Sequence, residues 1–80
     1  MWKVYILYSD KADRYYTGVT DDLPWRLERH NQSWGRYTKR GIPWEVVYIE
    51  KFETKSEALK REWEIKERKS KNYIENLIKK

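Results

Sequence analysis

Two short apolar segments near the N-terminus, separated by a polar turn, constrain the fold of this chain more than any other feature. The segment WKVYILY (2–8) places apolar or aromatic side chains on both faces of an extended chain, which is typical of a strand. The polar turn SDKAD follows it, and RYYTGVT (14–20) then predicts a returning strand, so the two segments form a hairpin. Gly18 weakens the second strand unless another group must approach the backbone closely there.

The segment after the hairpin carries the signals of a helix start. Asp21 or Asp22 can cap the first turn, and Pro24 suits that turn because its fixed φ is compatible with a helix. We expect this helix to run to about His30. Glycine and proline residues in the next segment, residues 31–43, predict a loop.

Residues 44–52, with the sequence WEVVYIEKF, are predicted to form the third strand. Both of its faces are apolar, which favours a central position covered on both sides. A second helix is expected over residues 54–69, with Thr54 as its cap and Glu57 as the partner three positions on. A shorter helix is expected over residues 71–78.

These elements predict an α+β fold in which a three-stranded antiparallel sheet is flanked by helices, in the order β-β-α-β-α-α. Eighty residues allow a single domain, spanning 1–80, with a thin core. The chain has no cysteine, so its 5 Trp, 7 Tyr and 1 Phe must supply much of the buried area. Neither a secretory leader nor a membrane-length apolar run is present, so we expect a cytoplasmic protein that is not bound to a membrane.

The charge of the chain is unevenly distributed. The formal net charge is +5, and residues 55–80 hold nine basic and five acidic side chains. A basic excess favours binding to a polyanion such as DNA, without sequence preference. A solvated helix end that only maintains solubility explains the same excess, and charge alone does not separate the two interpretations.

The first predicted helix places two polar residues on its apolar side. At 100° per residue, Arg26 and His30 fall on the same side as Leu23 and Leu27. An arginine that extends to solvent and a histidine at the boundary of the core are the ordinary structural explanation. The functional alternative is a site for a phosphate group.

The second predicted helix has the same property. Glu62 and Lys66 fall on the same side as Leu59 and Trp63. An ion pair between residues i and i+4 explains the two charges, but such a pair stabilises a helix by only about 0.2–0.5 kcal/mol. A carboxylate at the edge of a cleft that binds a divalent cation is the alternative.

Two tyrosines and an arginine complete a candidate site. Tyr5 and Tyr16 lie on one face of adjacent strands if the turn brings them together, although ordinary cross-strand packing explains such a pair equally well. A tyrosine hydroxyl can act as a general base if its surroundings favour the phenolate. An arginine such as Arg26 can stabilise the charge that develops on phosphorus. The chain has no Cys for thiol catalysis and no glycine-rich phosphate loop.

The predicted loop combines basic and aromatic side chains and has no acidic residue. This composition suits a strand of nucleic acid, whose bases stack and whose phosphates form ion pairs, although exposed solubilising charge explains it as well. The candidate contacts are Trp34, Arg36, Tyr37, Lys39 and Arg40.

Together these residues carry a resemblance to a known family. The segments VYIL (4–7), YYTG (15–18) and REWEIK (61–66), with Arg26 and His30 between the last two, resemble a GIY-YIG nuclease domain. The chain is most similar to the small stand-alone bacterial members of that family.

The resemblance implies a metal-dependent endonuclease that hydrolyses phosphodiester bonds in DNA with one divalent metal ion, Mg²⁺ or Mn²⁺. In that case Tyr16 is the general base, Arg26 stabilises the pentacovalent phosphate and Glu62 binds the metal. The resemblance also implies that Tyr5 is the tyrosine of the first half-motif and that His30 assists by hydrogen bonding or proton transfer.

The resemblance assigns Gly18 as the closing glycine of the motif, which lets backbone and substrate approach each other. Two positions depart from the family pattern. The first half-motif reads Lys3-Val4-Tyr5, without its glycine, and Thr17 stands where a bulkier aliphatic residue is usual. Both departures keep the tyrosines, and they put the geometry of the site in question rather than its presence.

Other functions are compatible with the same sequence. A non-catalytic nucleic-acid-binding module would retain the fold, and a protein-interaction domain would expose aromatic residues such as Trp34 and Tyr37. The sequence distinguishes neither DNA from RNA nor a monomer from a weak homodimer. It also leaves open whether another protein recruits the chain to its target.

Overall fold

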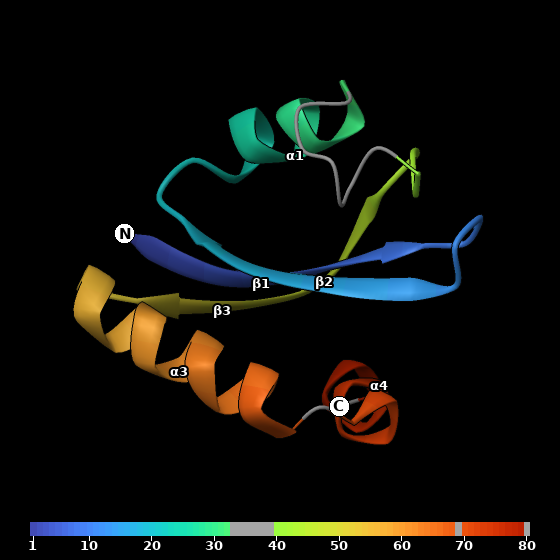
Figure 1. Ribbon diagram of the computed structural model, residues 1–80. Coiled ribbons are helices and arrows are strands. Elements are labelled where there is room, and N and C mark those ends of the chain that lie inside the picture. The colour runs from blue at the N-terminus through green and yellow to red at the C-terminus, as the bar shows by residue number, and fades with distance from the viewer. Residues whose placement is uncertain (33–39, 69, 80) are drawn as a thin grey trace.

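The computed structural model describes residues 1–32, 40–68 and 70–79 (Figure 1). Its elements are β1 (Trp2–Ser9), β2 (Arg14–Thr20), α1 (Leu23–Asn31), β3 (Glu45–Phe52), α3 (Lys55–Arg68) and α4 (Lys71–Lys79). The strands form an antiparallel sheet in the order β2-β1-β3. The predicted α+β fold and the order β-β-α-β-α-α are confirmed for the described part of the chain.

The predicted helix starts are confirmed by their hydrogen bonds. Asp22 caps α1, because its side chain accepts a hydrogen bond from the backbone N–H of Trp25 at 3.2 Å. Thr54 caps α3 in the same way, accepting from the backbone N–H of Glu57 at 3.2 Å. Each such cap is worth about 1 kcal/mol.

The prediction that residues 44–52 form the central strand is wrong. The central strand is β1, in which every side chain of the segment 4–7 is buried. β3 lies at an edge of the sheet, and Ile49 is 42% exposed there. Apolar residues on both faces of a strand show that both faces are covered, but they do not show whether a neighbour lies on each side. The signal that favours β3 as the edge strand is its three charges, Glu45, Glu50 and Lys51, against the single Lys3 of β1.

The sheet is covered on both faces (Figure 1). Helix α1 lies over one face, while α3 and α4 lie over the other. The α1 side contains a cluster of Tyr5, Leu7, Leu23 and Trp44, and the opposite side contains Val4, Ala58 and Ile65. Alternate residues of β1 thus hold both layers of the core together.

A polar cluster centred on Arg61 connects α3 to β3 and α4. The guanidinium of Arg61 donates hydrogen bonds to both carboxylate oxygens of Glu50, at 3.1 and 3.2 Å, and to the hydroxyl of Tyr73 at 3.1 Å. The hydroxyl of Tyr48 also donates a hydrogen bond to Glu50. We call these four residues the Arg61 cluster. It stabilises the packing of the helices on the sheet edge.

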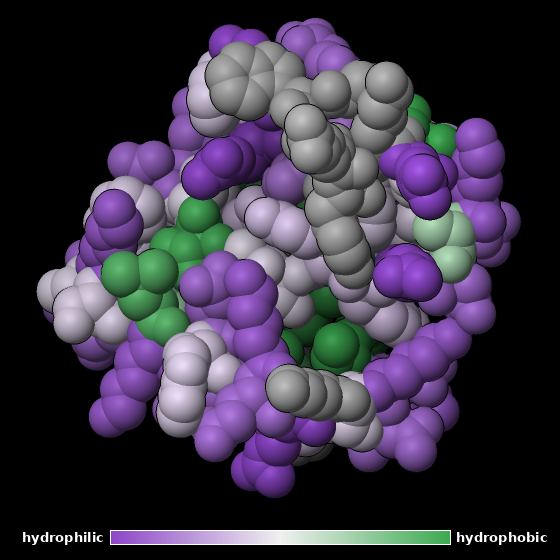
Figure 2. Space-filling view, viewed as in Figure 1, coloured by the Kyte–Doolittle hydropathy of each residue, from purple (hydrophilic) through white to green (hydrophobic). Residues whose placement is uncertain are grey.

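The face of the molecule in Figure 2 is covered mainly by hydrophilic side chains, and hydrophobic ones show only in small separate areas. Among the described helices, none has the length and apolar character needed to cross a membrane.

Candidate active site

A cleft of about 510 Å³ opens where the start of α1 and the middle of α3 meet the sheet. Its lining includes five residues predicted for the site, namely Tyr5, Tyr16, Gly18, Arg26 and Glu62. A sixth, His30, is hydrogen-bonded to one of these five, Tyr5. The structure therefore brings together residues from two strands and two helices that are far apart in the sequence.

The hairpin register determines how the two tyrosines lie. Tyr5 pairs with Gly18 and Leu7 pairs with Tyr16, so the tyrosines are diagonal neighbours rather than directly opposite each other. Their ring centroids are 6.4 Å apart. A Cβ at position 18 would collide with the phenol of Tyr5. The first consequence of Gly18 is therefore room for the ring of Tyr5, which crosses over β2 at this point.

Tyr5 and His30 form the inner wall of the site, where Tyr5 is buried and His30 is half-buried. The hydroxyl of Tyr5 lies 3.1 Å from Nε2 of His30, and Tyr5 is only 1% exposed. Burial, followed by the neighbouring Tyr16, raises the pKa of Tyr5 well above its usual range, although Arg26 opposes this rise. Burial, followed by the charge of Arg26, lowers the pKa of His30 from its ordinary value of 6.5. Because Tyr5 keeps its proton and His30 is neutral, we assign Tyr5 as the donor and Nε2 as the acceptor.

Tyr16 lies nearer to the mouth of the cleft than Tyr5. It is half-buried, and its ring meets the edge of the His30 ring at a centroid distance of 4.8 Å. The ammonium group of Lys66 lies 5.9 Å from the centroid of the Tyr16 ring. Tyr16 is therefore the more accessible of the two tyrosines, and it has a cation close by.

Arg26 is an exposed residue of α1 at the wall of the cleft. Within the described ranges, the structure records no ion pair for its guanidinium. Its charge nevertheless acts on the pKa of both Tyr5 and His30. A cation without a carboxylate partner, beside polar groups in a cleft, suits an anionic ligand such as phosphate.

Glu62 both forms an ion pair within its helix and lies at the edge of the cleft, so both interpretations made from the sequence apply. Its side chain is 20% exposed and lines the cleft, and it also forms the expected ion pair with Lys66 at 3.3 Å. The described residues contain no group of three or more His, Asp or Glu side chains that could hold a metal ion. A single carboxylate that already accepts a cation suits Mg²⁺, which commonly keeps several waters and binds substrate phosphates as further ligands.

The predicted contacts in the loop are mostly outside the described residues. This applies to Trp34, Arg36, Tyr37 and Lys39, so they stay predictions. Arg40 is described and is exposed.

Sequence reasoning missed two residues that shape the site. Asn31, at the end of α1, uses its side chain to accept from the backbone N–H of Trp44 at 2.6 Å and to donate to its carbonyl at 3.1 Å. This pair of hydrogen bonds attaches the end of α1 to the start of β3 and positions the adjacent His30. Trp25, 45% exposed, also lines the cleft. Its place next to Arg26 was the only signal in the sequence, and Asn31 had none because its partner is distant.

Comparisons with known proteins agree with this arrangement. The model of the GIY-YIG catalytic domain family matches residues 1–75 of the chain. UPF0213 proteins of Staphylococcus aureus strains Mu3 and N315 are each 56% identical to the chain over 52 residues, which are 64% of this chain and 63% of each relative. The chain thus spans less than two thirds of the length of these curated relatives.

A solved structure has a similar fold. It is the solution NMR structure of the UPF0213 protein BH0048 from Bacillus halodurans, which is 33% identical in sequence. The similarity covers 99% of this chain and 84% of that one, with a TM-score of 0.60.

Proposed function

The chain belongs to the GIY-YIG catalytic domain family, a family of nucleases, and on this premise we propose that it is an endonuclease that hydrolyses phosphodiester bonds in DNA with a divalent metal ion, Mg²⁺ or Mn²⁺. The observation that carries the proposal is the cleft itself. Arg26 and Glu62, which have opposite charges and come from different helices, line it together and both act on the pKa of Tyr5. Such a cleft can hold an anion and a cation side by side.

Arg26 binds the scissile phosphate in this proposal. Its guanidinium is available because, in the described part of the chain, no carboxylate forms an ion pair with it. Hydrolysis adds an oxygen to phosphorus and so adds negative charge to the equatorial oxygens. A planar, always charged guanidinium placed against those oxygens stabilises the transition state more than the ground state.

The two tyrosines have different roles in this proposal. Tyr5 keeps its proton, since burial raises its pKa, and it therefore acts as a hydrogen-bond donor that orients His30. Tyr16 lies at the mouth of the cleft, where water and substrate can reach its hydroxyl. We assign to Tyr16 the removal of a proton from the attacking water.

Glu62 holds the divalent ion. When bound there, a divalent ion would act as a Lewis acid toward the phosphate oxygens. Lys66 is the present partner of Glu62, and it is 53% exposed. Its side chain can therefore move into solvent when the carboxylate takes another cation.

A panel of linear, branched and single-stranded DNA, incubated with Mg²⁺, Mn²⁺ or EDTA, tests the proposal. We expect metal-dependent cleavage, and we expect Arg26→Ala to reduce its rate by about 10²–10³-fold, as the loss of one transition-state donor does in other enzymes. Arg26→Lys keeps the charge but loses the planar fork, so it should recover only part of the rate.

One result would contradict the assigned mechanism, and another would contradict the function. Cleavage that persists at full rate in Arg26→Ala would remove Arg26 from the mechanism. DNA binding without cleavage of any substrate would instead favour the alternative, a non-catalytic nucleic-acid-binding module with the same fold.

A further inference from the structure

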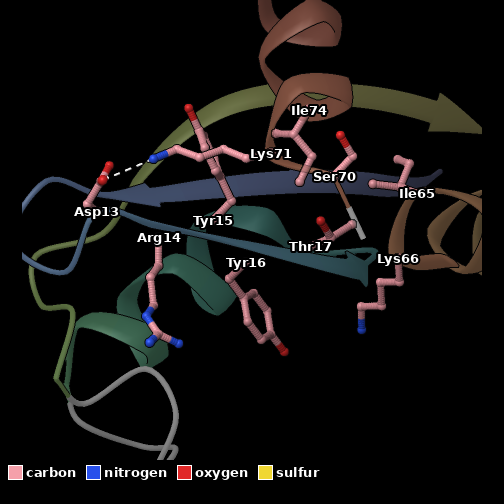
Figure 3. Close-up of a pocket in the computed structure, with 10 residues that line it drawn as sticks. All are labelled: Asp13, Arg14, Tyr15, Tyr16, Thr17, Ile65, Lys66, Ser70, Lys71 and Ile74. Atoms are coloured by element: carbon pink, nitrogen blue, oxygen red, sulfur yellow. Dashed lines mark hydrogen bonds and ion pairs between the residues drawn. The ribbon is translucent and has the colours of Figure 1, made fainter. Parts of the chain in front are cut away.

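A second hollow, larger than the cleft, adjoins it. A groove of about 660 Å³ runs along the outer edge of β2, beside the end of α3 and the start of α4 (Figure 3). We call it the β2 groove. Tyr16 and Thr17 form part of its wall, with Ile65 and Ile74 from the helices. Tyr16 lines both the cleft and the β2 groove, so the two hollows adjoin at the proposed catalytic tyrosine.

The rim of the β2 groove is cationic. It has three basic side chains, Arg14, Lys66 and Lys71, against one carboxylate, Asp13. Lys71 and Asp13 form an ion pair with each other at 2.9 Å, so their charges are mutually satisfied. Arg14 is exposed, and within the described ranges no carboxylate forms an ion pair with it. Lys66 is paired with Glu62 at 3.3 Å, so Arg14 is the basic side chain of the rim whose charge no carboxylate of the described residues neutralises.

Three side chains of the groove lining lie on the same side of β2. Arg14, Tyr16 and Lys66 all point the same way in Figure 3, while Lys71 lies on the other side of the strand. Arg14 and Tyr16 are alternate residues of β2, so their side chains leave the same face about 7 Å apart. A chain of phosphates that enters the cleft at Arg26 would meet Lys66 near Tyr16 and then Arg14.

Resting on the proposed function, we propose that the β2 groove holds the DNA strand on one side of the scissile phosphate, with Lys66 and Arg14 paired to successive phosphates. The charge of the rim favours a polyanion, and the Tyr16 wall that the groove shares with the cleft favours the substrate strand itself over a separate acidic ligand. The groove would then determine the length of DNA strand, next to the cleaved bond, that the protein contacts. It would contribute to affinity through phosphates rather than through base identity.

The test compares Arg14→Gln with Lys11→Gln. Both substitutions remove one positive charge from the same hairpin, but Lys11 lies in the turn and outside the groove lining. Binding of a short fluorescent single-stranded DNA is measured by anisotropy in EDTA over a series of KCl concentrations. We expect Arg14→Gln to weaken binding several-fold and to reduce the slope of log K against log salt by about 0.7, the value for one phosphate of a single strand. Lys11→Gln should keep the wild-type slope.

A neutral methylphosphonate placed at single positions of the DNA adds a second measurement. At the position that Arg14 contacts, it should abolish the difference between wild type and Arg14→Gln. Equal salt slopes for Arg14→Gln, Lys11→Gln and wild type would overturn the proposal, and so would undetectable binding by wild type at low salt.

The same oligonucleotide with Mg²⁺ separates the two proposals. Cleavage that Arg14→Gln leaves unchanged, together with an unchanged salt slope, would overturn the β2 groove and leave the nuclease standing. A reduced slope in Arg14→Gln without cleavage by wild type would support the groove and contradict the nuclease.

Discussion

Two neighbouring residues of α3, Arg61 and Glu62, belong to two different polar regions, the Arg61 cluster and the cleft. Arg61 donates to Glu50 and Tyr73, so its charge is used within the fold. Glu62 lines the cleft, where an exposed lysine is its ion-pair partner. Consecutive helical residues point about 100° apart, so one helix serves both the Arg61 cluster and the cleft.

The difference between the two regions shows how burial and pairing separate stabilising charges from available ones. In the Arg61 cluster, burial disfavours the charged form of Glu50, but hydrogen bonds from Arg61 and Tyr48 outweigh it and lower the pKa of Glu50. In the cleft, burial and Arg26 instead act against a charged His30, whose pKa falls. One region gains stability from its charges, and the other keeps charges that ligands can neutralise.

The largest expected effect on stability comes from Arg61→Ala. This change leaves Glu50 partly buried without its main partner, and we expect the free energy of unfolding to fall by about 2–3 kcal/mol. Urea denaturation followed by circular dichroism measures it. Lys60→Ala, at an exposed neighbour on α3, should stay within about 0.5 kcal/mol of wild type. If the two variants were equally stable, the Arg61 cluster would not be a stabilising region.

Gly18→Ala, a substitution at the cleft, should lower the free energy of unfolding by a somewhat smaller amount. The new Cβ collides with the phenol of the buried Tyr5, so the ring must shift away from His30, at a cost of about 1–3 kcal/mol. In a Tyr5→Leu background the ring is absent, and the cost of Gly18→Ala should largely disappear. An equal cost in both backgrounds would show that the glycine acts through the backbone and not through Tyr5.

The smallest expected effect is on the pH dependence of stability, which should differ between the cleft and the Arg61 cluster. The folded pKa of His30 lies below its unfolded value of 6.5, so the unfolded chain binds more protons and stability falls as the pH drops below about 6.5. The pKa of Glu50 is lowered from 4.5, so its contribution is present above that value and is lost only in stronger acid. Thermal unfolding between pH 7.5 and 5 measures the first effect. His30→Gln should flatten the curve in that range, and an unchanged curve would contradict a neutral, half-buried His30.

Much of the fold was predictable because local patterns carry it. The strands 2–8 and 14–20 and the caps Asp22 and Thr54 depend on neighbouring residues, and the structure agrees with them. The order of strands was predicted wrongly, because the apolar residues on both faces of 44–52 were given more weight than its three charges, Glu45, Glu50 and Lys51, which are typical of an edge strand. Pairing order depends on contacts between distant segments that a periodic pattern does not report.

The candidate site also has residues that the sequence could predict and residues that it could not. Helical periodicity grouped Arg26 and Glu62 with the apolar residues of their helices, and both line the cleft. It was wrong about which side of the second helix is buried, because Leu59 and Trp63 are 44% and 63% exposed. It could not find the bond of Asn31 to Trp44 or the pairing of Arg61 with Glu50, because each joins elements that meet only in the folded chain. The positioning groups were therefore less visible in the sequence than the groups that they position.

Single-turnover cleavage of DNA by Glu62→Gln and Glu67→Gln tests the central claim most directly. Both substitutions remove one carboxylate charge from α3, but only Glu62 lines the cleft. We expect Glu62→Gln to lose metal-dependent cleavage while it still binds DNA in EDTA, and we expect Glu67→Gln to cleave at the wild-type rate. Equal rates for the two variants would show that the cleft between α1 and α3 is not the site of hydrolysis.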